Sequence, residues 1–393
     1  MKLLFFTSKP IFPSVDGGCF ASEKMLLSLL KAEIDVRYVT LSTNKHPFDE
    51  ADFTRKMIHK FHPTNFFINT DVRPISAAFH LLKPGSYNAD RFYSKDIETK
   101  LLELIKSENF DGIVLDSLYS LPYFEAIRSN FSGQIVARTH NVEHQLWEQY
   151  AEDARGLKKW YLKRLAKDLK SFEMSALAKV DAILSISKDD TSEFKRLAIQ
   201  TPISEIPVSI EVAKTPALIA ENRIYHLGMM NWEPNRQAVN ELVSWMPELR
   251  KRLPQLELHI AGSGSKEMVE ANEDLGIFVH GFVECADDFA RNHGILVSPM
   301  RAASGVRIKF LEAMAQGVPI ISSQTGALGI DHESSECLII AHSREEFFER
   351  ISDLISNPSK GEEIARNALN YIDKNHNIDD ISKRIVEVFK RNT

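Results

Sequence analysis

The amino-acid sequence predicts an α/β protein of two domains, each a parallel β-sheet covered by helices. Short apolar runs alternate with longer segments whose apolar residues recur at helical spacing, which is typical of parallel sheets packed between helices. This series restarts after residues 201–222, where three prolines disfavour a continuous helix. Sheets of this kind bind ligands beyond the carboxyl ends of their strands, so two such domains facing each other would form a cleft with chemistry on both sides.

The individual elements follow from these runs in chain order. In the first series the apolar runs predict strands at residues 2–7, 35–41, 65–69, 112–116, 134–140 and 181–187. Helical spacing predicts helices at 20–31 and 94–106 and a long helix after Val142. In the second series strands are expected at 223–228, 256–262, 277–281, 295–299, 318–323 and 337–341, with helices that include 235–252, 287–292 and 307–316.

The domain boundaries are placed from the same pattern. We expect an N-terminal domain at residues 1–205, a second domain at 206–374 and a last segment at 375–393. A helix at 378–390 in this last segment has apolar residues at helical spacing and therefore needs a partner surface, for which we suggest the first domain.

Composition excludes several classes of protein. The chain has 393 residues, 44% of them hydrophobic, which argues against a disordered or collagen-like chain. The net charge of −6 argues against a protein that binds nucleic acid over its whole surface. Three widely spaced cysteines suit neither a disulfide framework nor a zinc motif. The apolar run at residues 3–7 is too short for a signal peptide, so we expect a cytoplasmic protein.

A glycine pair follows the first predicted strand. Gly17 and Gly18 lie where that strand turns into a helix, and glycines there let a ligand approach the backbone and the free N–H groups of the helix. A plain strand-to-helix turn is the alternative, since the chain has no GxGxxG motif here.

The segment RTHNVEH ends the predicted strand at 134–140. His140 and its polar neighbours occupy the carboxyl end of a strand, where sheet proteins place catalytic groups. A metal site would need His140 and His144 on one helix face with a third ligand, and the HExxH pattern is missing. We therefore expect hydrogen bonding to a polar substrate and no metal.

Residues 155–170 predict a basic amphipathic helix. They hold seven cations against one acidic residue, and their apolar residues recur at helical spacing. Such a helix suits contact with an anionic membrane surface, and the alternative is a solvated basic face over an ordinary core stripe.

The segment 299–319 is the richest in candidate chemistry. A strand ends at Pro299, a turn of small residues follows, and a helix is expected to begin near Val306. Arg301, Arg307 and Lys309 lie beside the positive end of this helix, an unfavourable placement unless an anion such as a phosphate binds there. The alternative is an ordinary exposed helix with a Lys309–Glu312 pair.

The same segment carries a resemblance to a known family. RIKFLEAMAQGVPIISS, residues 307–323, resembles the donor-binding motif of the GT-B glycosyltransferases of the retaining family 4, usually written EGFG…LEAMAxGxPVI. The supporting stretches are Gly17-Gly18, RTHNVEH, VDAILSISKDD, HLGMMNWEPN, LHIAGSG and VHGFVE, in the family's order over nearly the whole chain. The resemblance implies the GT-B fold of two Rossmann-like domains facing across a cleft, and transfer of a sugar from a nucleotide-diphosphate sugar.

The resemblance also assigns residues. It implies that Glu312 binds the ribose, that the backbone of residues 304–306 (Ser304, Gly305, Val306) contacts the sugar and phosphates, and that Gly228 and Asn231 belong to the donor site. His140 would contact the transferred sugar, and Gly17 and Gly18 the phosphate. No protein nucleophile, cofactor or metal is implied, because the leaving diphosphate itself is thought to take the acceptor proton.

Two departures from the family pattern bear on activity. Ser304 replaces the first acid of the family's E-x7-E motif, whose second acid matches Glu312. The Arg and Lys usual after the second domain's first strand are missing from GMMNWEPN. We infer that Arg307 and Lys309 take over the neutralisation of the diphosphate.

The sequence thus predicts a retaining transferase of the hexosyltransferase type in glycan biosynthesis, acting on a hydroxyl acceptor that is a glycan or a lipid-linked glycan. It would be cytoplasmic, or peripheral on the inner face of a membrane through residues 155–170. The alternatives are a nucleotide-sugar epimerase or inverting transferase on the same fold, and a noncatalytic carbohydrate- or nucleotide-binding subunit. The sequence leaves the nucleotide, the sugar, the acceptor and the oligomeric state open.

Overall fold

The computed structural model describes residues 1–14, 16–53, 60–71, 85–213, 222–301 and 305–390. The chain forms two compact units. Unit 1 comprises Met1–Ser209 together with the segment from Ile378 onward, and unit 2 comprises Ile210–Asn377. The boundaries lie within four residues of the predicted positions 205/206 and 374/375.

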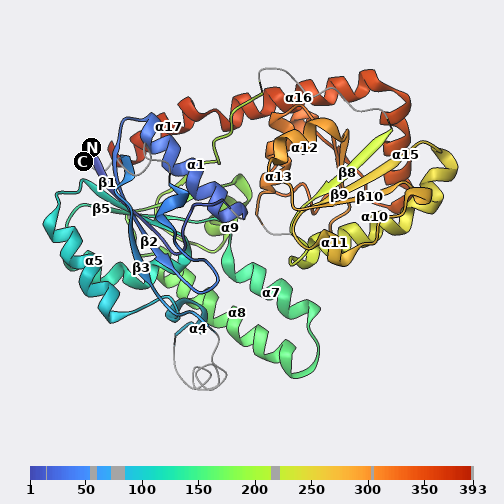
Figure 1. Cartoon of the computed structure of the whole chain (residues 1–393). Helices are drawn as coiled ribbons and strands as arrows, with labels where there is room; N and C mark the ends of the chain where they lie inside the picture. The colour runs from blue at the N-terminus through green and yellow to red at the C-terminus, as the bar shows by residue number, and fades with distance from the viewer. Residues whose placement is uncertain (15, 54–59, 72–84, 214–221, 302–304, 391–393) are drawn as a thin grey trace. The chain divides into compact units, whose positions relative to one another are not determined.

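Unit 1 is built on a seven-stranded sheet in the order β3-β2-β1-β4-β5-β6-β7, in which neighbouring strands are parallel. The strands are β1 (Lys2–Thr7), β2 (Asp35–Ser42), β3 (Thr64–Phe67), β4 (Gly112–Asp116), β5 (Gln134–Arg138), β6 (Ala182–Ser185) and β7 (Ile203–Glu205). The helices are α1 (Gly17–Lys31), α4 (Tyr87–Asp90), α5 (Lys95–Ser107), α6 (Phe124–Arg128), α7 (Glu143–Asp153), α8 (Gly156–Leu177), α9 (Lys188–Arg196) and α17 (Ile378–Lys390), with short 3₁₀ turns at Glu50–Asp52 and Leu118–Tyr123 (Figure 1).

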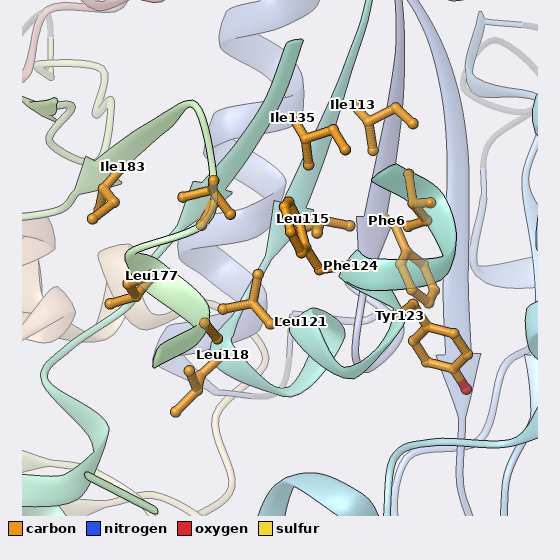
Figure 2. Close-up of a cluster of buried hydrophobic side chains, with 14 of the residues drawn as sticks. Phe6, Ile113, Leu115, Leu118, Leu121, Tyr123, Phe124, Ile135, Leu177 and Ile183 are labelled. Carbon is orange, nitrogen blue, oxygen red and sulfur yellow. The ribbon is translucent and has the colours of Figure 1, made fainter. Parts of the chain in front are cut away.

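Both faces of this sheet are buried, which explains its continuous apolar strands. Because successive side chains alternate, Leu4 and Phe6 of β1 point to one face and Leu3 and Phe5 to the other. The first face packs against α5, α6, α8 and α9, and Figure 2 shows the side chains gathered there. The second face packs against α1 and α17.

Helix α17 completes unit 1 although it comes last in sequence. Its apolar residues Ile381, Ile385, Val388 and Phe389 are buried in the core that also contains Leu3 and Phe5. Ser382 Oγ donates a 2.9 Å hydrogen bond to the carbonyl of Ser28 on α1. The partner surface that the apolar spacing requires is therefore the α1 face of the first sheet.

Unit 2 repeats the arrangement with a six-stranded parallel sheet in the order β10-β9-β8-β11-β12-β13. The strands are β8 (Arg223–Leu227), β9 (Glu257–Ala261), β10 (Ile277–Gly281), β11 (Ile295–Ser298), β12 (Ile320–Ser322) and β13 (Ile339–Ile340). The helices are α10 (Glu233–Arg252), α11 (Ser265–Met268), α12 (Ala286–Asn292), α13 (Ile308–Ala315), α14 (His332–Ser335), α15 (Arg344–Ser356) and α16 (Pro358–His376), with a 3₁₀ turn at Glu273–Leu275. The predicted α/β class with two Rossmann-like domains is confirmed.

Two details differ from the sequence prediction. The helix expected after Val142 is two helices, α7 and α8, because Gly156 adopts a left-handed backbone (φ +60°) that interrupts a right-handed helix. The proline-containing segment 201–222 also holds an edge strand, β7, which pairs with β6. β7 has only three residues and directly follows Pro202, so its apolar residues show no recognisable period.

Candidate functional site

In unit 2 the candidate ligand site lies where the strand order reverses. β8 and β11 are paired in the middle of the sheet, and the chain continues from them toward opposite edges. The loops that follow these two strands therefore start side by side at their carboxyl ends, which is where doubly wound sheets bind ligands. Gly228 begins one loop, and the other leads into α13.

Lys309 of α13 places its ammonium group at the end of β8. The Nζ atom lies 3.0 Å from the Leu227 carbonyl oxygen, 3.0 Å from Asn235 Oδ1 and 3.1 Å from His226 Nε2. An ammonium group has three protons and accepts none, so it donates to all three atoms. Lys309 thus brings a cation to the loop after β8, where the sequence itself has only GMMNWEPN.

The tautomer of His226 is fixed by the same network. Its Nδ1 lies 3.0 Å from the carbonyl oxygen of Val297 on β11 and must donate, so Nε2 keeps the lone pair that accepts from Lys309. Burial and the nearby Lys309 charge lower the pKa of His226 to about 3, so this ring is neutral at physiological pH. His226 joins β8 and β11 at the reversal point and orients Lys309.

The charge of Lys309 is costly in this setting. Burial, with a smaller contribution from the Arg307 guanidinium, lowers the pKa of Lys309 to about 7. An anion bound beside Nζ would favour the charged form and raise that pKa again. The site is therefore poised to gain a proton when an anion binds.

Arg307 provides the second cation. It is buried and is the N-cap residue of α13, which begins at Ile308 rather than near Val306 as predicted. Its guanidinium lies 5.1 Å from the Trp232 ring centre, and Nη2 donates a 2.7 Å hydrogen bond to the Gly305 carbonyl. Val306 and Gly305 are half-buried in the same turn.

Arg301 differs from its expected role. Its side chain is 75% exposed and forms an ion pair with Glu241 of α10. Its charge therefore has an acidic partner within unit 2, and only Arg307 and Lys309 of the three predicted cations lie together at the start of α13.

The remaining predicted residues of unit 2 divide into three cases. A Cβ on Gly228 would lie 2.4 Å from Nδ2 of the buried Asn235, so a larger residue there would displace the Asn235 side chain. Asn231 is exposed in the loop, and Glu312 is half-buried on α13. Burial of Tyr225 on β8, together with the nearby Glu312 charge, raises the pKa of Tyr225. Ser304 lies outside the described residues.

In unit 1 a second polar cluster surrounds the corresponding reversal between β1 and β4. Asp116, the last residue of β4, is buried and accepts hydrogen bonds from Arg138 Nη1 at 2.8 Å and from His140 Nε2 at 3.0 Å. Ser22 of α1 donates to its other oxygen. These partners hold the pKa of Asp116 well below its usual range although burial opposes this. His140 is thus oriented by a charged carboxylate.

The glycine pair lies against this cluster. Gly17 and Gly18 begin α1, and a Cβ on Gly18 would lie 3.3 Å from His140 Nδ1 and 3.1 Å from Lys9 Nζ. Lys9 forms an ion pair with Asp16, the N-cap of α1, at 2.6 Å, and this pairing lowers the pKa of Asp16 to about 2 despite burial. The structure therefore brings His140, the glycine pair and a cation that the sequence analysis did not select to one helix N-terminus.

His140 and His144 are not brought together. His144 is buried in the first turn of α7 and its Nδ1 lies 2.6 Å from Glu173 of α8. The other Glu173 oxygen accepts from the backbone N–H of Glu143 at 3.0 Å, so this carboxylate caps α7. Burial and the Glu173 charge raise the pKa of Glu143 to about 7.

The basic helix expected at 155–170 is the first part of α8, with Arg155 as its N-cap. The apolar residues of the predicted stripe differ in their burial. Leu165 and Leu169 are buried, whereas Leu157 is 86% and Trp160 59% exposed beside the exposed Lys158. Among the described residues, no helix has both the length and the apolarity needed to cross a membrane.

Known proteins resemble this chain in sequence. Residues 221–357, most of unit 2, match the family model described as "Glycosyl transferases group 1". A protein of Klebsiella pneumoniae described as an uncharacterized 44.6 kDa protein in the cps region is 24% identical over 307 residues, which cover 75% of this chain and 77% of that protein.

Solved structures resemble the chain over its full length. Sucrose-phosphate synthase from Thermosynechococcus elongatus has a TM-score of 0.72 at 14% identity and covers 100% of this chain and 99% of its own. TarM has a TM-score of 0.70 at 11% identity, covering 99% of each chain. HepE of Anabaena, solved with UDP-glucose, has a TM-score of 0.65 at 13% identity, covering 100% of each.

The two doubly wound sheets and these neighbours define the fold as GT-B. The match of residues 221–357 to the group 1 model indicates that the chain is a glycosyltransferase.

Proposed function

We propose that this glycosyltransferase moves a sugar from a nucleotide-diphosphate sugar to a hydroxyl acceptor with retention of anomeric configuration, as one step of glycan biosynthesis. The observation that carries the proposal is the Lys309 ammonium at the end of β8, next to Arg307 and the start of α13. Two cations and the helix N-terminus suit a diphosphate. Two proteins of similar fold bind donors of this class, since HepE was solved with UDP-glucose and the pneumococcal O-GlcNAc transferase GtfA with UDP and GlcNAc.

Each predicted site residue except Arg301 has a role in this proposal. Lys309 and Arg307 neutralise the diphosphate, Glu312 accepts hydrogen bonds from the ribose hydroxyls, and the backbone of residues 304–306 contacts the sugar and phosphates. Gly228 and Asn231 complete the donor loop. In unit 1, His140 hydrogen-bonds the transferred sugar, and Gly17 and Gly18 leave room for the phosphate.

The chemical step needs no protein nucleophile. The bond between the anomeric carbon and the diphosphate oxygen breaks, and the acceptor oxygen forms its bond on the same face. The acceptor proton passes to the leaving diphosphate, whose growing negative charge is stabilised by Lys309 and Arg307. Neither a metal nor a cofactor is required in this scheme.

The first experiment identifies the donor and tests Lys309. A thermal-shift screen of UDP-, GDP-, ADP- and CMP-sugars should show one nucleotide that raises the Tm, because a ligand stabilises the state to which it binds. With that donor, Lys309→Ala should raise KM at least tenfold or abolish turnover. Arg301→Ala is the matched control, since Arg301 is paired with Glu241, and its KM should stay near that of the wild type. Unchanged kinetics in Lys309→Ala would refute the assigned role.

One observation favours an inverting transferase as the second candidate. A histidine held by a buried carboxylate, as His140 is by Asp116, is a suitable general base for an acceptor hydroxyl. NMR of the anomeric proton in the first-formed product separates the two mechanisms, because net inversion contradicts retention. A free epimer of the nucleotide sugar would instead indicate the epimerase.

A noncatalytic binding subunit is the remaining alternative, because Ser304 replaces an acid of the family motif. Purified protein that hydrolyses or transfers the donor sugar, and loses this activity in His140→Ala while still binding the donor, excludes that alternative.

We also propose that α8 contacts an anionic membrane surface and thereby a lipid-linked acceptor. The exposed Leu157 and Trp160 adjoin Lys158, Lys159 and Lys163, a combination of apolar anchors and cations that suits an anionic headgroup region. In flotation assays the protein should bind vesicles of phosphatidylcholine with phosphatidylglycerol but not phosphatidylcholine alone. Binding that survives reversal of the three lysines to glutamate would contradict this proposal.

A further inference from the structure

Unit 2 contains a cluster of three histidines that the proposed transfer does not use. His259 is in β9, His280 is in the edge strand β10, and His293 follows α12. Each offers one ring nitrogen, and these three nitrogens lie within 4.8 Å of one another. None of the three residues belongs to the Lys309 network, so the cluster is a separate feature of this unit.

Hydrogen bonds set the tautomers of two of these rings. His259 Nε2 lies 3.1 Å from Glu257 Oε2 and donates to it, which leaves the His259 Nδ1 lone pair facing His280 Nε2 at 2.9 Å. His293 Nδ1 lies 2.7 Å from the carbonyl oxygen of Phe289 and donates to it, which leaves the Nε2 lone pair of His293 free to accept or to bind a metal.

This pattern is the one found around metal-binding histidines. A ligating imidazole presents one nitrogen to the metal while its other N–H is held by a carboxylate or a backbone carbonyl, which fixes the ring orientation. Glu257 and the Phe289 carbonyl supply these two outer contacts here. His280 can present Nε2 in its other neutral tautomer, and both His280 and His293 are partly exposed, which gives an ion access.

We propose that His259, His280 and His293 bind one divalent transition-metal ion of the zinc class. Three imidazole nitrogens suit Zn²⁺ or Co²⁺ in tetrahedral coordination, with a water molecule as the fourth ligand. The ion would link the edge strand β10 to β9 and to the end of α12, and so stabilise the sheet edge of unit 2. Aromatic neighbours also fix the orientation of two of the rings. The ring centroids of His293 and Phe289 lie 4.0 Å apart and those of His259 and Phe278 lie 5.1 Å apart, and both pairs are stacked.

Cobalt provides the direct test. Protein without a histidine tag is stripped of metal with a chelator, dialysed and titrated with Co²⁺. A tetrahedral site should give visible absorption bands that saturate at one equivalent and disappear when Zn²⁺ is added. Zn²⁺ alone should raise the Tm by about 5 °C at a hundredfold excess over Kd.

Variants then assign the site. His280→Gln and His293→Gln should each abolish the cobalt bands. His342→Gln is the matched control, because His342 is an exposed histidine elsewhere in unit 2, and it should bind like the wild type. Glu257→Gln keeps all three ligands but removes the carboxylate, so it should bind about tenfold more weakly.

Two results would overturn the proposal, and the first does not depend on the folding of any variant. One is wild-type protein that gives no cobalt bands and no zinc-dependent change in Tm. The other is a bound ion whose absorption is unchanged in both His280→Gln and His293→Gln.

Discussion

The lowered pKa of Lys309 predicts that donor affinity falls steeply with pH. In the free protein this pKa is about 7, whereas a bound diphosphate would hold the ammonium form. Binding at higher pH must therefore first protonate Lys309, and the apparent Kd should increase by the factor 1 + 10^(pH−7). That factor is about 11 at pH 8 and about 100 at pH 9, the latter equal to about 2.7 kcal/mol.

The perturbation that isolates this effect is Lys309→Arg. A guanidinium stays charged throughout this pH range, so the affinity of the variant should be nearly independent of pH. Lys309→Met, which has no charge at any pH, should bind weakly and should also show little pH dependence. Diesterified phosphates of a nucleotide sugar do not titrate between pH 6 and 9. Any change of Kd with pH in this range therefore comes from the protein.

The assay is isothermal titration with the intact nucleotide sugar from pH 6 to pH 9, in buffers of different ionisation enthalpy. These buffers also reveal the proton taken up on binding, which should approach one per donor above pH 8. A wild-type Kd that stays constant over this range would show that Lys309 is already protonated in the free protein. A Lys309→Arg variant that keeps the wild-type pH dependence would show that another group titrates.

Four further substitutions test stability, and their effects are measured by urea denaturation. Gly262→Ala should lower the free energy of unfolding by about 3 kcal/mol or more, because the backbone has φ +121° and a Cβ would lie 1.9 Å from a backbone oxygen. Gly156→Ala, where nothing lies within 4 Å of a Cβ, should cost only about 1 kcal/mol, and equal costs would contradict this account. Asp116→Asn should cost about 3 kcal/mol, because it leaves the buried Arg138 cation without its charged partner, and an unchanged midpoint would show that the ion pair is dispensable. Phe389→Ala should cost about 3 kcal/mol through lost core packing in unit 1, and a loss below 1 kcal/mol would show that α17 is only loosely attached.

The fold was predictable because the strands of both sheets are buried on two faces. Each strand is then a short continuous apolar run, and the helices between them carry a clear period. The elements that escaped prediction lack such a signal. β7 is an edge strand of three residues, and the break between α7 and α8 depends on the backbone of Gly156 alone.

The candidate sites were predictable only in part. The sequence pointed to Lys309 as a cation at a helix start, but its contact with the end of β8 spans 82 residues and depends on strand order. His226 lies inside the apolar strand β8, within a stretch that supports the family resemblance, but nothing in the sequence shows that it contacts Lys309. Asp116 ends the apolar strand β4 and belongs to none of the quoted motifs. The histidines of the proposed metal site are separated by 21 and 13 residues, a spacing without a recognisable signature, and they meet through the pairing of β9 with β10 and the return of α12.

The position of α17 in unit 1 determines the order in which the molecule can be completed during synthesis. Unit 2 is one uninterrupted stretch and can fold as soon as Asn377 has left the ribosome. Unit 1 is made first, but the face that carries Leu3 and Phe5 lacks its final cover until α17 has been translated. In the nascent chain this apolar face therefore stays partly uncovered while the whole of unit 2 is synthesised. During that interval the chain is most prone to aggregate and most in need of a chaperone.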